Sequence, residues 1–114
     1  MNDWRRQLAQ AQLEAYNARN IEAFCKCYHK EVIVRDLQKM EVMAEGMSAF
    51  REIYRRKFDS NPELHCELMS RVVLEQSVID EELVTGNVGQ AEPRRVVAIY
   101  AFRDQLIDRV WFTR

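Results

Sequence analysis

Residues 96–112 read VVAIYAFRDQLIDRVWF, and this stretch decides the fold class. β-Branched and aromatic residues run through both of its halves, as they do in β-strands. The polar pair Asp104-Gln105 between the halves marks a tight turn. The stretch therefore predicts two antiparallel strands, over residues 94–104 and 106–114, that form a hairpin.

The predicted hairpin is apolar on both of its faces. In the first strand, one face carries Val97, Ile99 and Ala101, and the other carries Val96, Ala98, Tyr100 and Phe102. An antiparallel sheet with one face in water shows polar residues on that face. We therefore expect a second copy of the chain to cover the outer face, which predicts a homodimer formed through the sheet.

The rest of the chain places helices before strands. The spacing of apolar residues predicts helices over residues 3–19, 21–29 and 47–60, a short strand over 32–35, a loop over 37–46, and strands over 64–76 and 77–86. Helices that precede a run of antiparallel strands are typical of an α+β domain, in which the helices pack on one face of a curved sheet.

The composition indicates one globular domain over residues 1–114. The chain is 47% hydrophobic and 31% charged, which suits an ordinary core, and its formal net charge is −1. This near-neutral balance provides no electrostatic attraction to nucleic acid or to an anionic membrane, so neither is an expected partner.

Location and cofactors are predicted from what the sequence lacks. No stretch approaches the roughly 18 apolar residues that span a bilayer, and the N-terminal MNDWRRQLAQ has no signal-peptide core. The cysteines, Cys25, Cys27 and Cys66, show neither a disulfide framework nor a zinc-binding spacing. We therefore expect a cytoplasmic protein with reduced thiols and no metal. A glycine-rich phosphate loop is also missing, so no cofactor is predicted.

Three segments carry a resemblance to a known superfamily: AYNARNIEAFCKCYHKEVIVRDL (residues 15–37), EGMSAFREIYRRKF (45–58) and VVAIYAFRDQLIDRVWF (96–112). In this order they resemble the nuclear transport factor 2-like superfamily, in its SnoaL-like and ketosteroid-isomerase-like branch. The resemblance implies a cone-shaped, curved antiparallel sheet, cystatin-like, wrapped around the N-terminal helices. It also implies an apolar pocket at the open end that binds or transforms a small hydrophobic molecule. Family members often have Gly where this chain has Gln105, which predicts a different turn.

The resemblance points to Asp36 as the catalytic residue. Ketosteroid-isomerase-like chemistry uses one carboxylate to move the proton, while a tyrosine and a neutral carboxylic acid stabilise the enolate. Asp36 falls on the base position, but Gln12 and Ala98 fall on the positions of the other two groups. Steroid isomerisation is therefore not expected. Asp36 remains a candidate for cyclase-like proton transfer, and the alternative is a solvated residue at the strand end.

A second group of acids is Asp80, Glu81 and Glu82, inside an otherwise apolar strand. Alternation places Asp80 and Glu82 on one face and Glu81 on the other. An inward carboxylate could pair with Asp36 and share a proton. We favour the other interpretation, in which these acids are solvated or lie at a dimer edge.

The resemblance implies an aromatic and apolar pocket wall, as is usual for such sites. The residues we assign to it are Tyr16, Tyr54, Phe58, Tyr100, Val110 and Phe112. Three functions stay open at this point. The chain is an isomerase-like or cyclase-like enzyme, a non-catalytic ligand-binding module, or a dimerisation scaffold whose own side chains fill the cone.

Overall fold

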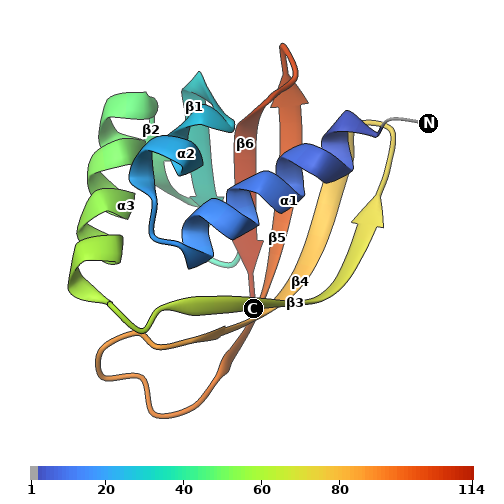
Figure 1. Ribbon diagram of the computed structural model, residues 1–114. Coiled ribbons are helices and arrows are strands. Elements are labelled where there is room, and N and C mark those ends of the chain that lie inside the picture. The colour runs from blue at the N-terminus through green and yellow to red at the C-terminus, as the bar shows by residue number, and fades with distance from the viewer. Residues whose placement is uncertain (1–2) are drawn as a thin grey trace.

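The structure, a computed structural model, describes residues 3–114. In chain order the elements are α1 (Trp4–Asn17), α2 (Ile21–Lys26), β1 (Tyr28–Asp36), β2 (Glu41–Glu45), α3 (Met47–Ser60), β3 (His65–Val73), β4 (Ser77–Thr85), β5 (Arg94–Arg103) and β6 (Leu106–Thr113). Within this range a curved six-stranded sheet wraps around α1, and α3 lies beside the end of the sheet formed by β1 and β2 (Figure 1). The predicted α+β class with a curved sheet is confirmed.

The sheet brings the first strand next to the last. Within residues 3–114 the strand order is β2-β1-β6-β5-β4-β3, and only β1 and β6 pair in parallel. On β5 and β6, Tyr100 lies opposite Val110, and Ala98 lies opposite Phe112. These four side chains share the inner face of the sheet, because side chains directly opposite each other in a ladder point the same way.

The predicted tight turn between β5 and β6 is confirmed. Asp104 and Gln105 have φ values of 54° and 60°, the left-handed pair that matches the twist of two antiparallel strands. Gln105 thus adopts the conformation that glycine usually provides. The expectation of a different turn at this position is therefore wrong.

Two predicted boundaries near β1 are also wrong. The second predicted helix, 21–29, ends at Lys26, and Tyr28 begins β1. The cause is pairing with β6, since the carbonyl oxygen of Cys27 accepts a hydrogen bond of 3.0 Å from the N–H of Ile107. This tertiary contact overrides the helical spacing of the sequence.

The second wrong boundary lies in the predicted loop 37–46, which contains strand β2. This strand pairs antiparallel with the end of β1. Its side chains do not alternate between buried and exposed, and both Val42 and Met43 are exposed. The pattern that identifies a half-buried strand is therefore missing from the sequence.

Aromatic rings from α2, α3 and β1 form one side of the core. The ring centroid of Phe50 lies 4.4 Å from that of Tyr28, 4.7 Å from that of Tyr54 and 5.6 Å from that of Phe24. Such ring pairs stabilise beyond the area that they bury. The cluster holds α3 against β1 and so fixes the direction in which Tyr54 points.

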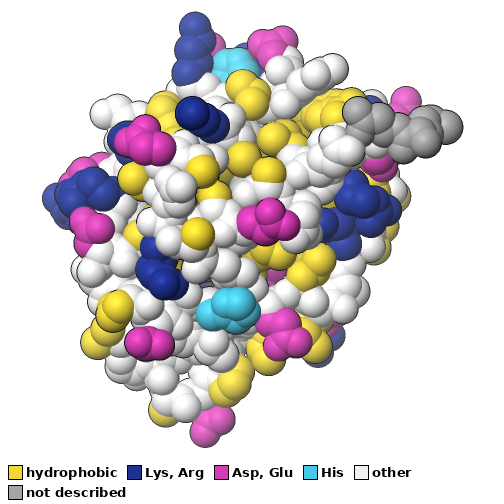
Figure 2. All heavy atoms as spheres, in the orientation of Figure 1, with side chains coloured by type: hydrophobic (Ala, Val, Ile, Leu, Met, Phe, Trp, Pro, Cys, Tyr) yellow, Lys and Arg dark blue, Asp and Glu magenta, His cyan; other side chains and the backbone are white. Residues whose placement is uncertain are grey.

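The surface that carries the helices is mixed in charge. In Figure 2, Lys and Arg side chains are interspersed with Asp and Glu side chains over this face. In residues 3–114, no helix is long and apolar enough to cross a membrane.

Candidate functional site

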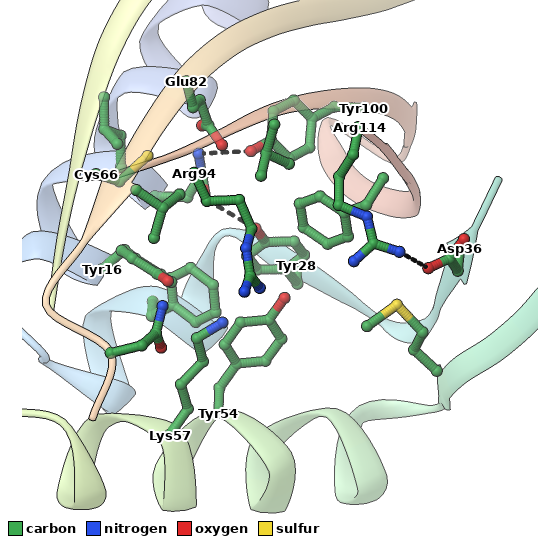
Figure 3. Close-up of a pocket in the computed structure, with 18 residues that line it drawn as sticks. Tyr16, Tyr28, Asp36, Tyr54, Lys57, Cys66, Glu82, Arg94, Tyr100 and Arg114 are labelled. Carbon is green, nitrogen blue, oxygen red and sulfur yellow. Dashed lines mark hydrogen bonds and ion pairs between the residues drawn. The ribbon is translucent and has the colours of Figure 1, made fainter. Parts of the chain in front are cut away.

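A cavity of about 180 Å³ lies between α1, α3 and the inner face of the sheet (Figure 3). The polar side chains that line it include Gln12 and Tyr16 from α1, Tyr54 and Lys57 from α3, and Cys66, Glu82, Arg94 and Tyr100 from the strands. An apolar cavity of about 150 Å³ is enough for benzene, whereas drug-sized ligands need about 300–1,000 Å³. The cavity therefore suits a molecule of about one ring.

The predicted wall residues that line the cavity are Tyr16, Tyr54, Tyr100 and Phe112. Phe58 and Val110 lie in the core instead, with only 5% and 2% of their surfaces exposed. Phe58 meets Tyr16 edge to face, with 5.4 Å between the ring centroids. The structure thus places Phe58 and Val110 behind the wall rather than in it.

Asp36 lines the outer end of the cavity, where β1 ends and the chain turns. Its Oδ2 lies 3.1 Å from a guanidinium nitrogen of Arg114, and its Oδ1 accepts from the N–H of Lys39 at 3.1 Å. Figure 3 shows this pair well away from Glu82. Asp36 thus combines a cavity position with a strand-end turn, and its role in proton transfer stays a prediction.

The acids of β4 alternate as predicted, but the inward pair is not solvated. Asp80 and Glu82 have 0% and 5% of their surfaces exposed, whereas Glu81 points outward and pairs with Arg95. Asp80 binds Arg71 through two contacts of 2.7 and 2.9 Å. The solvated interpretation is therefore wrong for Asp80 and Glu82, and neither of them pairs with Asp36.

Glu82 is the buried carboxyl group inside the cavity. Within residues 3–114 it forms no ion pair, and the thiol of Cys66 donates a hydrogen bond to it. Burial, reinforced by the negative charge of Asp80, raises the pKa of Glu82 from 4.5 to about 7. Near neutral pH this group therefore exists in both its protonated and its ionised form.

Gln12 holds two tyrosines beside Glu82. The hydroxyl of Tyr28 donates to Oε1 of Gln12 at 2.8 Å, and Nε2 of Gln12 donates to the hydroxyl oxygen of Tyr100 at 3.1 Å (Figure 3). In the part of the chain that the structure describes, the Tyr100 proton has no acceptor. Burial raises the pKa of both tyrosines well above 10, so both stay protonated. Tyr100 can therefore donate a hydrogen bond into the cavity.

Lys57 of α3 is a cavity residue that the predicted wall did not include. The charges of helix α3 suggest a wet face, yet Lys57 lines the cavity, with its ammonium 5.9 Å from the ring centroid of Tyr16. A signal was present, because Lys57 follows Tyr54 by three residues and so shares its helix face. Arg94 lines the cavity too, on the inward side of β5.

Among residues 3–114, no cluster of three His, Cys, Asp or Glu side chains is arranged to hold a metal.

The fold and its cavity define a class of small cone-shaped α+β domains. Residues 9–110 match the model of the SnoaL-like domain, and the chain belongs to this family. The predicted place in the nuclear transport factor 2-like superfamily is confirmed. A comparison with curated proteins found no match.

Solved structures share the whole fold. An uncharacterised cystatin-fold protein from Novosphingobium aromaticivorans is 26% identical, with a TM-score of 0.86 over 95% of this chain and 96% of that one. A candidate ketosteroid isomerase from Kribbella flavida is 17% identical, with a TM-score of 0.83 over 96% and 76% of the two chains. A candidate polyketide cyclase from Sinorhizobium meliloti is 13% identical, with a TM-score of 0.81 over 94% of each chain. At these identities, the last two show the fold alone.

Proposed function

We propose that the protein binds a small apolar carbonyl compound and moves a proton on it, with Glu82 as the base. The observation that carries this proposal is a buried carboxyl group that lines a small cavity, with its pKa raised to about 7. A general base works best when its pKa lies near the ambient pH. The likeness in fold to a candidate isomerase and a candidate cyclase supports the same class of reaction.

The reaction follows from the positions of the polar groups. Ionised Glu82 removes a proton from the carbon beside the carbonyl, and the electrons of the C–H bond move to the carbonyl oxygen. The enolate that forms accepts a hydrogen bond from the hydroxyl of Tyr100. Protonated Glu82 then returns the proton, either to the same carbon or to one conjugated with it. The result is proton exchange or isomerisation, without any other reactant.

The size of the cavity limits the substrate. About 180 Å³ accommodates about seven non-hydrogen atoms when the six of benzene fit in about 150 Å³. A steroid is therefore too large, in agreement with the absence of the full steroid isomerase constellation from the sequence. The expected substrate is a ketone or a related carbonyl compound with one ring or a short chain.

In this proposal Asp36 shapes the mouth of the cavity and does not carry the proton. Both of its oxygens already have partners, Arg114 and the N–H of Lys39. These contacts hold both oxygens at the rim of the cavity. Asp36 therefore becomes the matched control for Glu82.

The test is deuterium uptake from D₂O at the carbons beside the carbonyl of cyclohexanone, followed by NMR. We expect the wild-type protein to accelerate uptake, Glu82→Gln to lose the acceleration, and Asp36→Asn to keep most of it. Binding of cyclohexanone without accelerated uptake would contradict the proposal and favour a non-catalytic binding module. If Glu82→Gln still accelerates uptake, Glu82 is not the base.

We also propose that the outer face of the sheet pairs with a second copy of the chain. Val72, Ile79, Ile99 and Trp111 lie opposite one another across β3, β4, β5 and β6, and they form one apolar row. Arg35 extends this row on β1, and Glu81 lies beside it on β4. Both signs of charge thus flank the row, which suits a self-complementary two-fold interface. Ile99→Glu should convert the dimer to a monomer in sedimentation equilibrium, and a wild-type monomer would contradict the proposal.

A further inference from the structure

Three hydrogen-bond donors point into the same part of the cavity. Figure 3 shows the ammonium of Lys57, the guanidinium of Arg94 and the hydroxyl of Tyr54 directed toward one another. Lys57 and Tyr54 share one face of α3, and Arg94 comes from the start of β5. All three line the cavity. The arrangement places two positive charges and a neutral donor around one space.

The two cations have no carboxylate partner in the described part of the chain. Arginines elsewhere form ion pairs with acids, among them Arg51, Arg55, Arg71, Arg95 and Arg114. Between residues 3 and 114, neither Lys57 nor Arg94 forms such a pair. Burial and the nearby Arg94 lower the pKa of Lys57, so its charged form is disfavoured as the cavity stands. An anion between the two cations would relieve that repulsion.

Tyr54 adds a donor suited to the same anion. Burial raises the pKa of Tyr54, so its hydroxyl stays protonated and can donate. Arg presents its N–H groups in a fixed fork that matches the two oxygens of a carboxylate. A point-charge ammonium and a hydroxyl beside this fork complete the set of donors for one small anion.

We propose that the natural ligand is a small monocarboxylate, held by Lys57, Arg94 and Tyr54 through its carboxylate. The apolar part of the ligand then lies against the cavity wall. This inference names the substrate class of the site above, and it rests on the proposed function only for the statement that the ligand undergoes proton transfer. The substrate class is therefore a small oxo acid, with the carbonyl within reach of Glu82 and the carboxylate at the cations.

A single negative charge fits better than two. Glu82 lies in the same cavity and interacts with Lys57 through their charges. A dianion such as phosphate would add repulsion from this carboxyl group whenever it is ionised. The cavity also limits the enclosed part of the ligand to about one ring.

The test compares benzoate with benzamide, which have the same shape and differ in charge. Their dissociation constants are measured by NMR titration with the wild-type protein and with Lys57→Met and Arg94→Met. We expect benzoate to bind at least about tenfold more tightly than benzamide to the wild type, and each substitution to remove most of this preference. Arg95→Met is the matched control, because Arg95 adjoins Arg94 and points outward to Glu81.

Two results would overturn the carboxylate site. In one, benzoate binds the wild type no more tightly than benzamide, or neither of them binds. In the other, the preference survives both Lys57→Met and Arg94→Met. Lys57→Arg keeps the charge and should keep the preference, which separates loss of charge from loss of fold. Inorganic phosphate that displaces benzoate more strongly than acetate does would overturn the choice of a monocarboxylate.

The binding test and the proton-transfer test fail separately. A preference for benzoate without deuterium uptake into cyclohexanone leaves the carboxylate site in place and contradicts the proposed function. Deuterium uptake without a preference for benzoate contradicts the carboxylate site alone.

Discussion

The two ends of the cavity each hold a carboxyl group, and their surroundings are opposite. At the outer end, Asp36 faces the guanidinium of Arg114 and accepts the N–H of Lys39. At the inner end, Glu82 is almost completely buried, and within residues 3–114 only the Cys66 thiol donates a hydrogen bond to it. Burial without a cation in direct contact, rather than position at the end of a strand, is what raises a carboxyl pKa toward neutral pH. In the proposed function, Asp36 therefore has a structural role and Glu82 is the base.

The largest effect is expected at a third acid, Asp80, which is buried as deeply as Glu82 but has a cation. Asp80→Asn leaves the guanidinium of Arg71 buried without its counter-charge, and breaking a buried pair costs about 3–5 kcal/mol. Glu82 would ionise more readily once the charge of Asp80 is gone, which offsets a small part of this loss. Urea denaturation near neutral pH measures it. Glu81→Gln, on the outward face, is the control and should change the stability little.

The next effect is on turnover. Replacing a positioned general base typically costs about 10²–10⁴ in rate, so Glu82→Gln should slow deuterium uptake into cyclohexanone by about 10²–10³, or about 3–4 kcal/mol. Asp36→Asn should stay within about threefold of the wild type. Equal losses of rate in the two variants would show that Asp36 and Glu82 contribute equally to deuterium uptake. Both variants should give the wild-type circular dichroism spectrum.

The third prediction concerns the dependence of stability on pH. The pKa of Glu82 rises from 4.5 in the unfolded chain to about 7 in the fold, so its contribution to stability is present below pH 4.5 and is lost as the pH rises through about 7. At about 1.4 kcal/mol for each pKa unit, the difference amounts to about 3 kcal/mol.

Glu82→Gln removes the ionisable group and should therefore remove this loss. Urea denaturation of the wild type and of Glu82→Gln at about pH 5 and about pH 8 measures the difference. The free energy of unfolding of the variant should increase relative to that of the wild type as the pH rises. If the free energies of unfolding of the wild type and of the variant change equally between the two pH values, Glu82 titrates in the fold as it does in the unfolded chain.

The strand pattern predicted the direction of the acids but not their surroundings. Alternation along β4 correctly grouped Asp80 with Glu82 and separated Glu81, because that period is a property of any strand. Which of the two faces lies inside depends on the helix that the sheet wraps around. A buried acid also needs a partner, and Arg71, the partner of Asp80, lies nine residues away on the neighbouring strand β3. Neither fact is local, so the sequence favoured solvent for all three acids.

The same limit applies to the wall of the cavity. Tyr54, Tyr100 and Phe112 were predictable, because aromatic residues on the inner face of a curved sheet or on the apolar stripe of α3 have few other places to point. Lys57 was not among the predicted wall residues, because charged side chains usually lie in water. Its position within the apolar stripe is a local signal, but only the fold shows that this stripe borders a cavity rather than a filled core.

The smallest effect is expected from removing the cation at the outer end. Arg114 is half-exposed, with 47% of its side chain accessible, and such pairs contribute about 0.2–1 kcal/mol. Arg114→Met should therefore lower the free energy of unfolding by less than about 1 kcal/mol, and a double-mutant cycle with Asp36→Asn measures the coupling. In the double variant Arg114→Met with Glu82→Gln, Asp36 is the remaining cavity carboxyl without a cation. It still accepts the N–H of Lys39 at the rim, away from the hydroxyl of Tyr100, so deuterium uptake should stay low. Recovered uptake in this variant would show that a missing cation alone turns a carboxyl group of this cavity into a base.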